Sequence, residues 1–178
     1  PQYRASQGDD GYVSLEVSPA LAHDAEGTVD AARRLWTAID RPNAMIKIPA
    51  TAAGVTALAT LIREGINVNV TLLFAQETYA SVADAYLAGL EQLARRGGDL
   101  SSVASVASFF VSRIDTEADA EIFVLLKKST HEEERAKLEG LQGKIAVANA
   151  KLAYQRYQGL FSGSRWDALA RQGATSQI

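Results

Sequence analysis

Apolar strands alternate with helical segments over the first two-thirds of the chain, and this alternation constrains the fold more than any other feature. The expected strands are residues 12–17, 44–48, 67–74 and a stretch around 107–114. Helices with apolar residues at helical spacing are expected between them, at residues 28–39, 52–62 and 75–96. Strands that alternate with helices of ten or more residues form βαβ units and a parallel sheet. We therefore expect an α/β fold.

The length of the chain limits how such a sheet closes. A closed eight-stranded βα barrel normally takes about 250 residues, and about 200 is near the minimum. This chain has 178 residues, and residues 115–170 are expected to be mostly helical. No linker or internal repeat divides the sequence. Two architectures remain open at this point: a small open α/β sheet, or part of a barrel without its ends.

The composition excludes several classes of function. The net charge is -3 and the isoelectric point is about 5.4, so there is no basic stripe of the kind that binds nucleic acid. No segment approaches the roughly 18 uninterrupted apolar residues of a membrane helix. The chain has no cysteine, which excludes thiolate chemistry, and its two histidines lack metal-ligand spacing. We expect a cytoplasmic globular protein without a nucleic-acid or membrane partner.

A polar face on the third strand is the first sign of a functional site. Asn67, Asn69 and Thr71 share one face of that strand, whereas the strands of a parallel sheet normally bury both faces and are apolar throughout. A polar cavity at the end of the strand explains such a face.

Lys47 lies in the preceding strand, within the apolar sequence MIKIP. Burial disfavours the charged form of a lysine, and the neutral amine is the form that attacks a carbonyl, so a buried lysine suits Schiff-base chemistry. Two other interpretations remain open. The lysine pairs with a carboxylate for packing, or it lies on an edge strand and extends to solvent.

Other strands add polar groups to the same cavity. Glu16 shares a face with Ser14 in the first strand, where it is either an exposed edge residue or a carboxylate that transfers protons beside Lys47. Ser108 and Phe110 share a face in the fourth strand. Arg113, near the expected end of that strand, either clamps a phosphate or forms a surface salt bridge. In βα barrels, active sites form at the carboxyl ends of several strands.

These residues lie in segments that resemble the transaldolase family, over most of the chain. The segments are VSLEVSPALAHD, MIKIPAT, EGINVNVTLLF, SVASFFVSRID and KIAVANAKLAYQRY. The pairing of the MIKIP lysine with GINVNVTLLF about twenty residues later is specific to that family. The FFVSR segment and the NAKLAYQRY helix look closest to the bacterial branch that includes actinobacterial and cyanobacterial enzymes.

The resemblance implies a role for each candidate residue. Lys47 matches the Schiff-base lysine, Glu16 the glutamate that works with a catalytic water, and Thr71 the threonine that holds this water. Asn69 matches the asparagine that binds the donor's hydroxyls. The phosphate side corresponds to Ser108 and Arg113, and Phe110 matches the phenylalanine that shapes the pocket. No cofactor or metal is implied.

The resemblance also implies a fold and an activity. Residues 1–178 are expected to form a single domain, an incomplete transaldolase barrel: a partial TIM (β/α)8 barrel with about strands three to six and their helices. The strand that carries the family's acid/base aspartate is expected before Pro1, and the seventh strand after Ile178. The implied reaction transfers a dihydroxyacetone unit between sugar phosphates in the pentose phosphate pathway.

Two alternatives to that reaction remain. One is a fructose-6-phosphate aldolase-like lyase, which shares the lysine; Phe110, where a tyrosine would favour the lyase, favours transfer. The other is an inactive fragment that is stable only as an assembly, by self-association or with another chain, because a partial barrel leaves open sheet edges. The sequence does not decide whether the parent is fused to another enzyme.

Overall fold

The computed structural model describes residues 1–177 and contains one parallel sheet whose four strands lie in sequence order. The strands are β1 (Val13–Glu16), β2 (Ala44–Pro49), β3 (Val68–Leu73) and β4 (Ser105–Phe109). They are connected by α2 (Ala25–Ile39), α3 (Ala52–Arg63) and α4 (Gln76–Arg95). The remaining elements are α1 (Gln2–Ala5), η1 (Pro19–Leu21), η2 (Leu100–Ser102), α5 (Ser112–Lys128), α6 (Glu132–Glu139), α7 (Ile145–Leu160) and α8 (Gly163–Ala170). The predicted α/β fold with a parallel sheet is confirmed.

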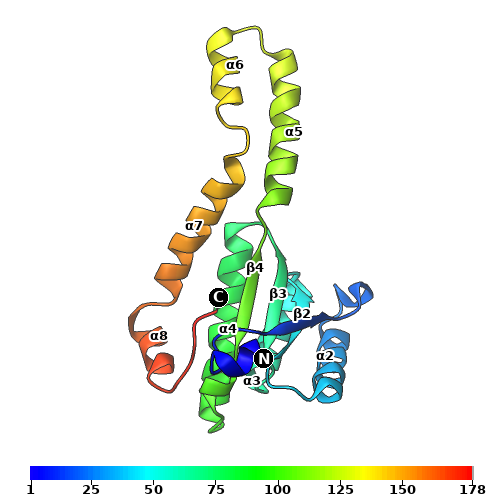
Figure 1. Cartoon of the computed structure of the whole chain (residues 1–178), viewed down its shortest axis with the longest axis vertical. Coiled ribbons are helices and arrows are strands. Elements are labelled where there is room, and N and C mark those ends of the chain that lie inside the picture. Colours follow the sequence, from blue (N-terminus) through cyan, green and yellow to red (C-terminus); the bar gives the residue numbers. More distant parts are fainter. Residues whose placement is uncertain (178) are drawn as a thin grey trace.

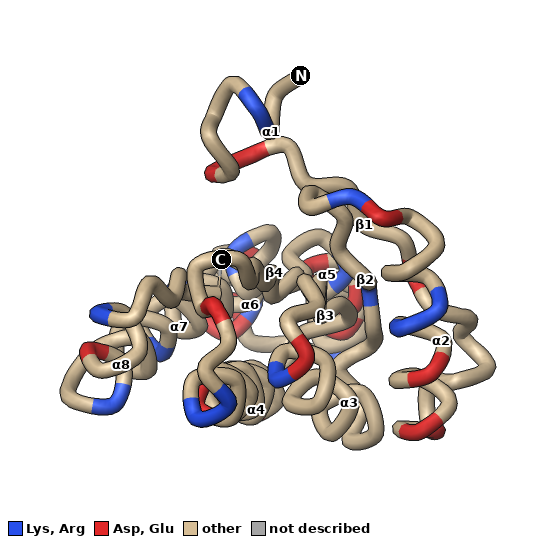
Figure 2. Tube along the Cα trace, turned by 90° about the horizontal axis from the view of Figure 1, so that it is seen from below, with Lys and Arg blue, Asp and Glu red and all other residues tan. Residues whose placement is uncertain are grey.

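All three connecting helices lie on the same face of the sheet. Figure 1 shows the order of the elements, and Figure 2 shows α2, α3 and α4 side by side beneath the strands. A doubly wound sheet carries helices on both faces, whereas a βα barrel carries them only on the outside. Of the two architectures that the sequence left open, the structure therefore matches the partial barrel. The face without helices corresponds to the barrel interior.

The hydrophobic core lies between the sheet and these helices. Ile46, Ile48, Val68 and Val70 are fully buried in it, while the residues between them in the strands point to the other face. On the helix side the core is closed by buried leucines and isoleucines of α3 and α4. This alternation separates an apolar face that stabilises the sheet from a polar face that is available for chemistry.

Side-chain caps fix where the helices begin. The Asp24 carboxylate accepts a hydrogen bond from the amide of Gly27 at 2.9 Å, so α2 begins at Ala25, three residues before the predicted start. Thr51 caps α3 in the same way, accepting from the amide of Gly54 at 3.0 Å. The Gly97-Gly98 pair follows the end of α4, as predicted, and Gly97 has a φ of +71°.

The predicted extent of the fourth strand is wrong at its end. β4 ends at Phe109, the chain turns at Val111, and α5 begins at Ser112. The sequence FFVSRI is a short apolar run, and such runs are compatible with either a strand or the first turn of a helix. Arg113 therefore lies in the first turn of a helix and not in a strand.

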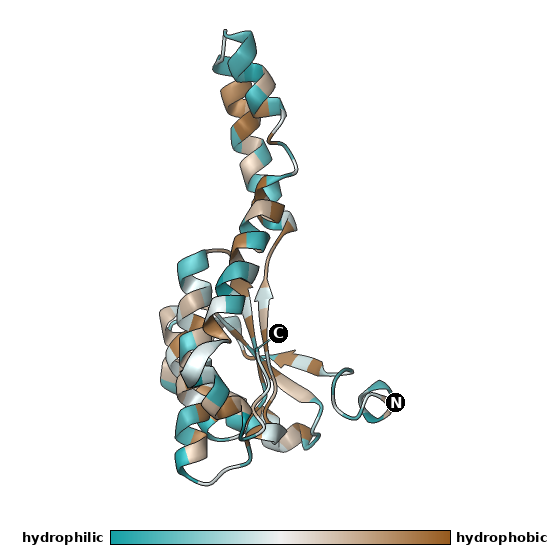
Figure 3. Cartoon of the chain, turned by 90° about the vertical axis from the view of Figure 1, so that its left-hand side faces the viewer, coloured by the Kyte–Doolittle hydropathy of each residue, from teal (hydrophilic) through white to brown (hydrophobic). Residues whose placement is uncertain are grey.

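The two helices after β4 form an arm that projects away from the sheet. Figures 1 and 3 show α5 and α6 extending beyond the body of the molecule, and residues 1–12 standing apart from it beside β1. The charged run His131–Arg135 lies at the start of α6 and is mostly exposed, as a solvated helix face. None of the helices described between residues 1 and 177 combines the length and apolar character that crossing a membrane requires.

Tyr86 of α4 anchors the chain after α8. Its ring is fully buried and its hydroxyl donates to the carbonyl of Thr175 at 2.8 Å. Burial raises the pKa of Tyr86, so the hydroxyl remains a donor. Tyr86→Phe is expected to lower the free energy of unfolding by about 1 kcal/mol, because one hydrogen bond is lost and the packing is kept. Urea unfolding measures the change, with the exposed Tyr154→Phe as the control; equal stability of the two variants would contradict this role.

Candidate active site

Three polar side chains form one row across the open face of the sheet. Glu16 of β1 pairs in register with Lys47 of β2, and Lys47 pairs with Asn69 of β3. Adjacent strands lie about 4.8 Å apart, so neighbouring residues of the row are within reach of the same small molecule. The structure thus brings together the residues that the sequence singled out on three separate strands. Within residues 1–177, no group of three or more His, Cys, Asp or Glu side chains has the arrangement of a metal site.

Lys47 and Glu16 form an ion pair at the centre of this row. The Lys47 Nζ lies 3.7 Å from Glu16 Oε2, and the two side chains are 30% and 50% exposed. Lys47 is therefore only partly buried, and Glu16 is the carboxylate partner that the sequence left as an alternative. An ion pair with this exposure contributes at most about 1 kcal/mol to stability. Packing of the sheet alone gives no reason for a charged pair at this position.

Asn69 links the two outer strands across the face. Its Nδ2 donates to Ser14 Oγ of β1 at 3.0 Å, and its Oδ1 accepts from Ser108 Oγ of β4 at 2.8 Å. In a flat sheet the strands β1 and β3 are about 9.6 Å apart, twice the spacing of neighbours, which is too far for this bond. The sheet therefore curls toward the open face, as the wall of a barrel does. The two hydrogen bonds fix the orientation of the amide beside Lys47.

Thr71 lies two residues beyond Asn69 and pairs in register with Pro49. Its side chain is buried, and its Oγ1 has no hydrogen-bond partner among the described residues. Leaving a buried hydroxyl unpaired costs about 1–3 kcal/mol, and such groups in native structures call for an explanation. The donor and the acceptor of this hydroxyl are both unused, and in this structure neighbouring atoms cover its oxygen.

A β-bulge follows Thr71 and changes which side chains face the site. Val70 pairs with Ala107 and Leu73 with Phe109, so three steps along β3 match two steps along β4. The extra residue is Leu72, whose φ of +64° is a left-handed conformation that costs a residue with a Cβ about 1–2 kcal/mol. Leu73 is thereby returned to the core, and Phe74 takes the place beside Phe110.

Phe74, Phe110 and Arg113 form a stack at the carboxyl end of the sheet. The rings of Phe74 and Phe110 are 5.0 Å apart with their planes at 89°, an edge-to-face pair. The Arg113 Cζ lies 4.8 Å from the centre of the Phe110 ring. This cation–π contact holds the guanidinium beside Phe110, which follows Ser108 by two residues in the chain. Arg113 reaches this position from the first turn of α5.

The sequence missed two residues of this arrangement, Ser14 and Phe74. Ser14 could have been predicted, because it lies two residues before Glu16 in the same strand and therefore on the same face. Phe74 had no such signal, because regular alternation from Thr71 puts Leu73, and not Phe74, on the open face. Only the bulge at Leu72 reverses this order, and nothing in the apolar run TLLF marks it.

Comparisons with known proteins agree on the kind of protein to which this chain is similar. A family model described as Transaldolase/Fructose-6-phosphate aldolase matches residues 3–168. A Transaldolase of Thermobifida fusca is 55% identical over 177 residues, which is 99% of this chain and 46% of that protein. A Transaldolase of Trichodesmium erythraeum is 52% identical over 177 residues, 99% of this chain and 47% of that protein. The chain thus spans about half the length of the curated relatives that it matches.

Proposed function

This chain belongs to the transaldolase/fructose-6-phosphate aldolase family, and on that premise we propose that it carries the residues of a transaldolase site that form and support the Schiff base. The proposed reaction moves a dihydroxyacetone unit from a ketose phosphate, fructose 6-phosphate or sedoheptulose 7-phosphate, to an aldose phosphate. The observation that carries the proposal is the row of Glu16, Lys47 and Asn69 on the open face of the sheet. The proposed setting is the pentose phosphate pathway in the cytoplasm.

Lys47 is the proposed nucleophile. Its neutral amine adds to the ketone carbon, a C–N bond forms, and the former carbonyl oxygen leaves as water once it has been protonated. Glu16, whose Oε2 lies 3.7 Å from Nζ, is proposed to exchange these protons through a water held by the Thr71 hydroxyl, which has no hydrogen-bond partner among the described residues. The resulting protonated imine withdraws electrons, so it takes up the electron pair when the C3–C4 bond of the ketose breaks. The C4 hydroxyl gives its proton to the acid/base carboxylate that the resemblance places in the rest of the barrel, and C4 becomes the aldehyde carbon. The aldose phosphate leaves, and the three-carbon unit remains on Lys47 as an enamine.

The second half-reaction reverses these steps with another aldose phosphate. The enamine carbon attacks the new aldehyde, and water then hydrolyses the imine and frees Lys47. Asn69 is proposed to hold the hydroxyls of the three-carbon unit, because its amide is already oriented by Ser14 and Ser108. The Arg113 guanidinium, which lies against Phe110, and the Ser108 hydroxyl, which lies against Asn69, are proposed to bind the phosphate group.

The curated relatives are about twice as long as this chain, so we would test the reaction in a polypeptide of their full length. We would use a hybrid polypeptide in which residues 1–178 replace the matching segment of the Thermobifida fusca relative. Formation of sedoheptulose 7-phosphate from fructose 6-phosphate and erythrose 4-phosphate by this hybrid would support the proposal. A folded hybrid without this transfer would contradict it.

Phe110 separates the transferase from the lyase alternative within the same family. A phenylalanine has no hydroxyl that can orient a water toward the enamine or imine. The three-carbon unit is therefore expected to remain on Lys47 until an aldose phosphate binds. Phe110→Tyr in the hybrid is expected to raise the release of free dihydroxyacetone from fructose 6-phosphate several-fold and to lower transfer. An enzyme-coupled assay of dihydroxyacetone measures the first rate. Rapid release by the hybrid with Phe110 in place would favour the lyase.

The second alternative is an inactive chain that is stable only as an assembly. Val13 and Leu15 of β1, the edge strand, are 68% and 45% exposed, and this exposure favours association. Size-exclusion chromatography of the 178-residue chain, together with the transfer assay, separates this alternative from a compact active monomer.

A further inference from the structure

Asn149 of α7 is hydrogen-bonded to the corner between β3 and α4. Its Nδ2 donates to the carbonyl of Phe74 at 2.8 Å. Its Oδ1 and its own carbonyl both accept from Gln76 Nε2, each at 2.7 Å. These bonds join residues more than seventy positions apart, and among residues 1–177 Asn149 is the only side chain that donates a hydrogen bond to the Phe74 carbonyl.

The same helix is fixed to α5, which carries Arg113. The Asp115 Oδ1 accepts from the amide of Ala146 at 2.8 Å, in the first turn of α7. α7 therefore holds two pieces of the stack: the corner with Phe74, and the first turn of α5 with Arg113. Phe110 connects them, because it contacts both Phe74 and Arg113.

We propose that Asn149 is a positioning residue, which holds Phe74 against Phe110 and so fixes the Arg113 guanidinium for the phosphate of the substrate. This inference rests on the proposed function, and Asn149 itself does not touch the substrate. Leu72 supplies the reason that such a clamp is needed. Its left-handed conformation is strained, and relaxation to an extended backbone would remove the bulge and turn Phe74 away from Phe110.

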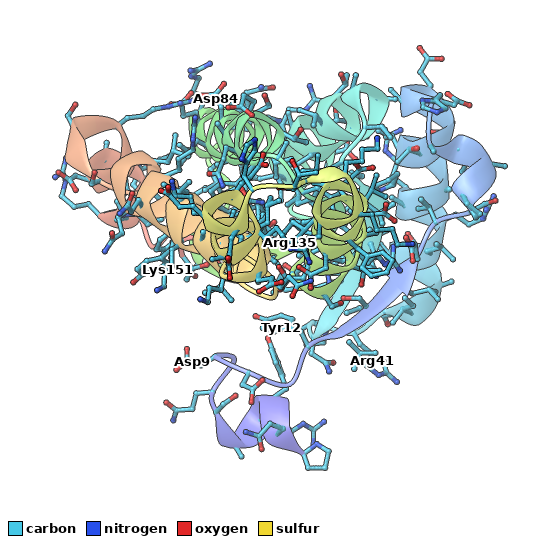
Figure 4. The ribbon with its side chains drawn as sticks, turned by 90° about the horizontal axis from the view of Figure 1, so that it is seen from above. Asp9, Tyr12, Arg41, Asp84, Arg135 and Lys151 are labelled. Atoms are coloured by element: carbon cyan, nitrogen blue, oxygen red, sulfur yellow. The ribbon has the colours of Figure 1, made fainter. Side chains whose placement is uncertain are left out.

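The geometry is tested in the 178-residue chain, without catalysis. Nuclear Overhauser effects between the rings of Phe74 and Phe110 report the stack, and a hydrogen–deuterium exchange profile reports the fold. Asn149→Ala and Asn149→Asp are both expected to weaken these effects strongly while the core amides stay protected. The aspartate keeps the size and the acceptor but lacks the donor to the Phe74 carbonyl. Lys151→Ala is the matched control, because Lys151 is an exposed residue at the surface of the same helix (Figure 4). An unchanged ring pair in both Asn149 variants would overturn the proposal.

The consequence for substrate binding is tested in the hybrid polypeptide. Asn149→Ala is expected to raise KM for fructose 6-phosphate about tenfold and to change kcat less than threefold, because the phosphate contact is loosened and the Lys47 chemistry is not. With unphosphorylated fructose as donor, the variant is expected to match the parent. In an Arg113→Ala background, Asn149→Ala is expected to add no further increase in KM.

Different results would contradict the proposed function and the positioning role of Asn149. A hybrid that is inactive with all its own residues in place would contradict the proposed function, and the ring-pair measurement would still decide whether Asn149 sets the stack. Additive effects of the Asn149 and Arg113 substitutions on KM, or equal losses with fructose and fructose 6-phosphate, would overturn the positioning role.

Discussion

Lys47→Met in the hybrid polypeptide is expected to lower the transfer rate by about 10⁴-fold or more. Methionine has a similar length and no amine, so neither the C–N bond nor the imine can form. Removal of a covalent nucleophile costs enzymes several orders of magnitude in kcat. The initial rate of sedoheptulose 7-phosphate formation measures the loss.

The same substitution is expected to leave the fold intact. The Lys47–Glu16 pair is 30% and 50% exposed, so its loss changes stability by about 1 kcal/mol or less. Lys151→Met, on the exposed surface of α7, is the matched control and should retain full activity. A Lys47→Met hybrid that keeps more than about a tenth of the parent rate would exclude Lys47 as the nucleophile.

Asn67→Ala is expected to cause a large loss of stability, about 3 kcal/mol. The Asn67 side chain is buried and joins the starts of three strands, β2, β3 and β4. Its Nδ2 donates to the carbonyls of Pro42 and Ala44 at 3.0 and 3.1 Å, and its Oδ1 accepts from the amide of Ala104 at 2.8 Å. Each lost hydrogen bond costs about 1 kcal/mol, and buried backbone groups left unpaired add to that. Thermal unfolding measures the change, and the expected fall in Tm is about 6–12 °C.

A residue of the same type provides the control for this prediction. Asn43 is partly buried and, within residues 1–177, makes a single side-chain hydrogen bond, from Nδ2 to the carbonyl of Gly11 at 2.9 Å. Asn43→Ala is expected to cost about 1 kcal/mol or less. If the two variants lose equal stability, the three bonds of Asn67 do not hold the strand ends together.

The sheet and the row of Glu16, Lys47 and Asn69 could be predicted from the sequence. The alternation of apolar and polar residues along a strand is a local property. Residues 46, 48, 68 and 70 are apolar and pack against the helices, while Lys47, Asn69 and Thr71 fall on the other face. Parallel strands that follow one another in the chain lie side by side, so the polar residues of each strand meet in one row. The row of Glu16, Lys47 and Asn69 follows from these two rules. The catalytic roles of these residues remain a proposal.

The rest of the site depends on features that have no local signal. The bulge at Leu72 reverses the alternation and brings Phe74 beside Phe110, and the residues around it contact β4 and α7, which are distant in the sequence. Arg113 was predicted at the end of a strand but lies in a helix, because α5 begins at Ser112. The apolar run FFVSRI is compatible with either structure. The hydrogen bond between Asn69 and Ser14 requires a curled sheet, and curvature is a property of the whole layer.

The central claim, that Lys47 forms a Schiff base with a ketose phosphate, is tested most directly by chemical trapping. The hybrid polypeptide is incubated with fructose 6-phosphate, reduced with sodium borohydride, digested and examined by peptide mass spectrometry. We expect a reduced three-carbon adduct on the peptide that contains Lys47, and its absence when borohydride or substrate is omitted. An adduct on a different lysine, or no adduct on a folded hybrid, would contradict the account.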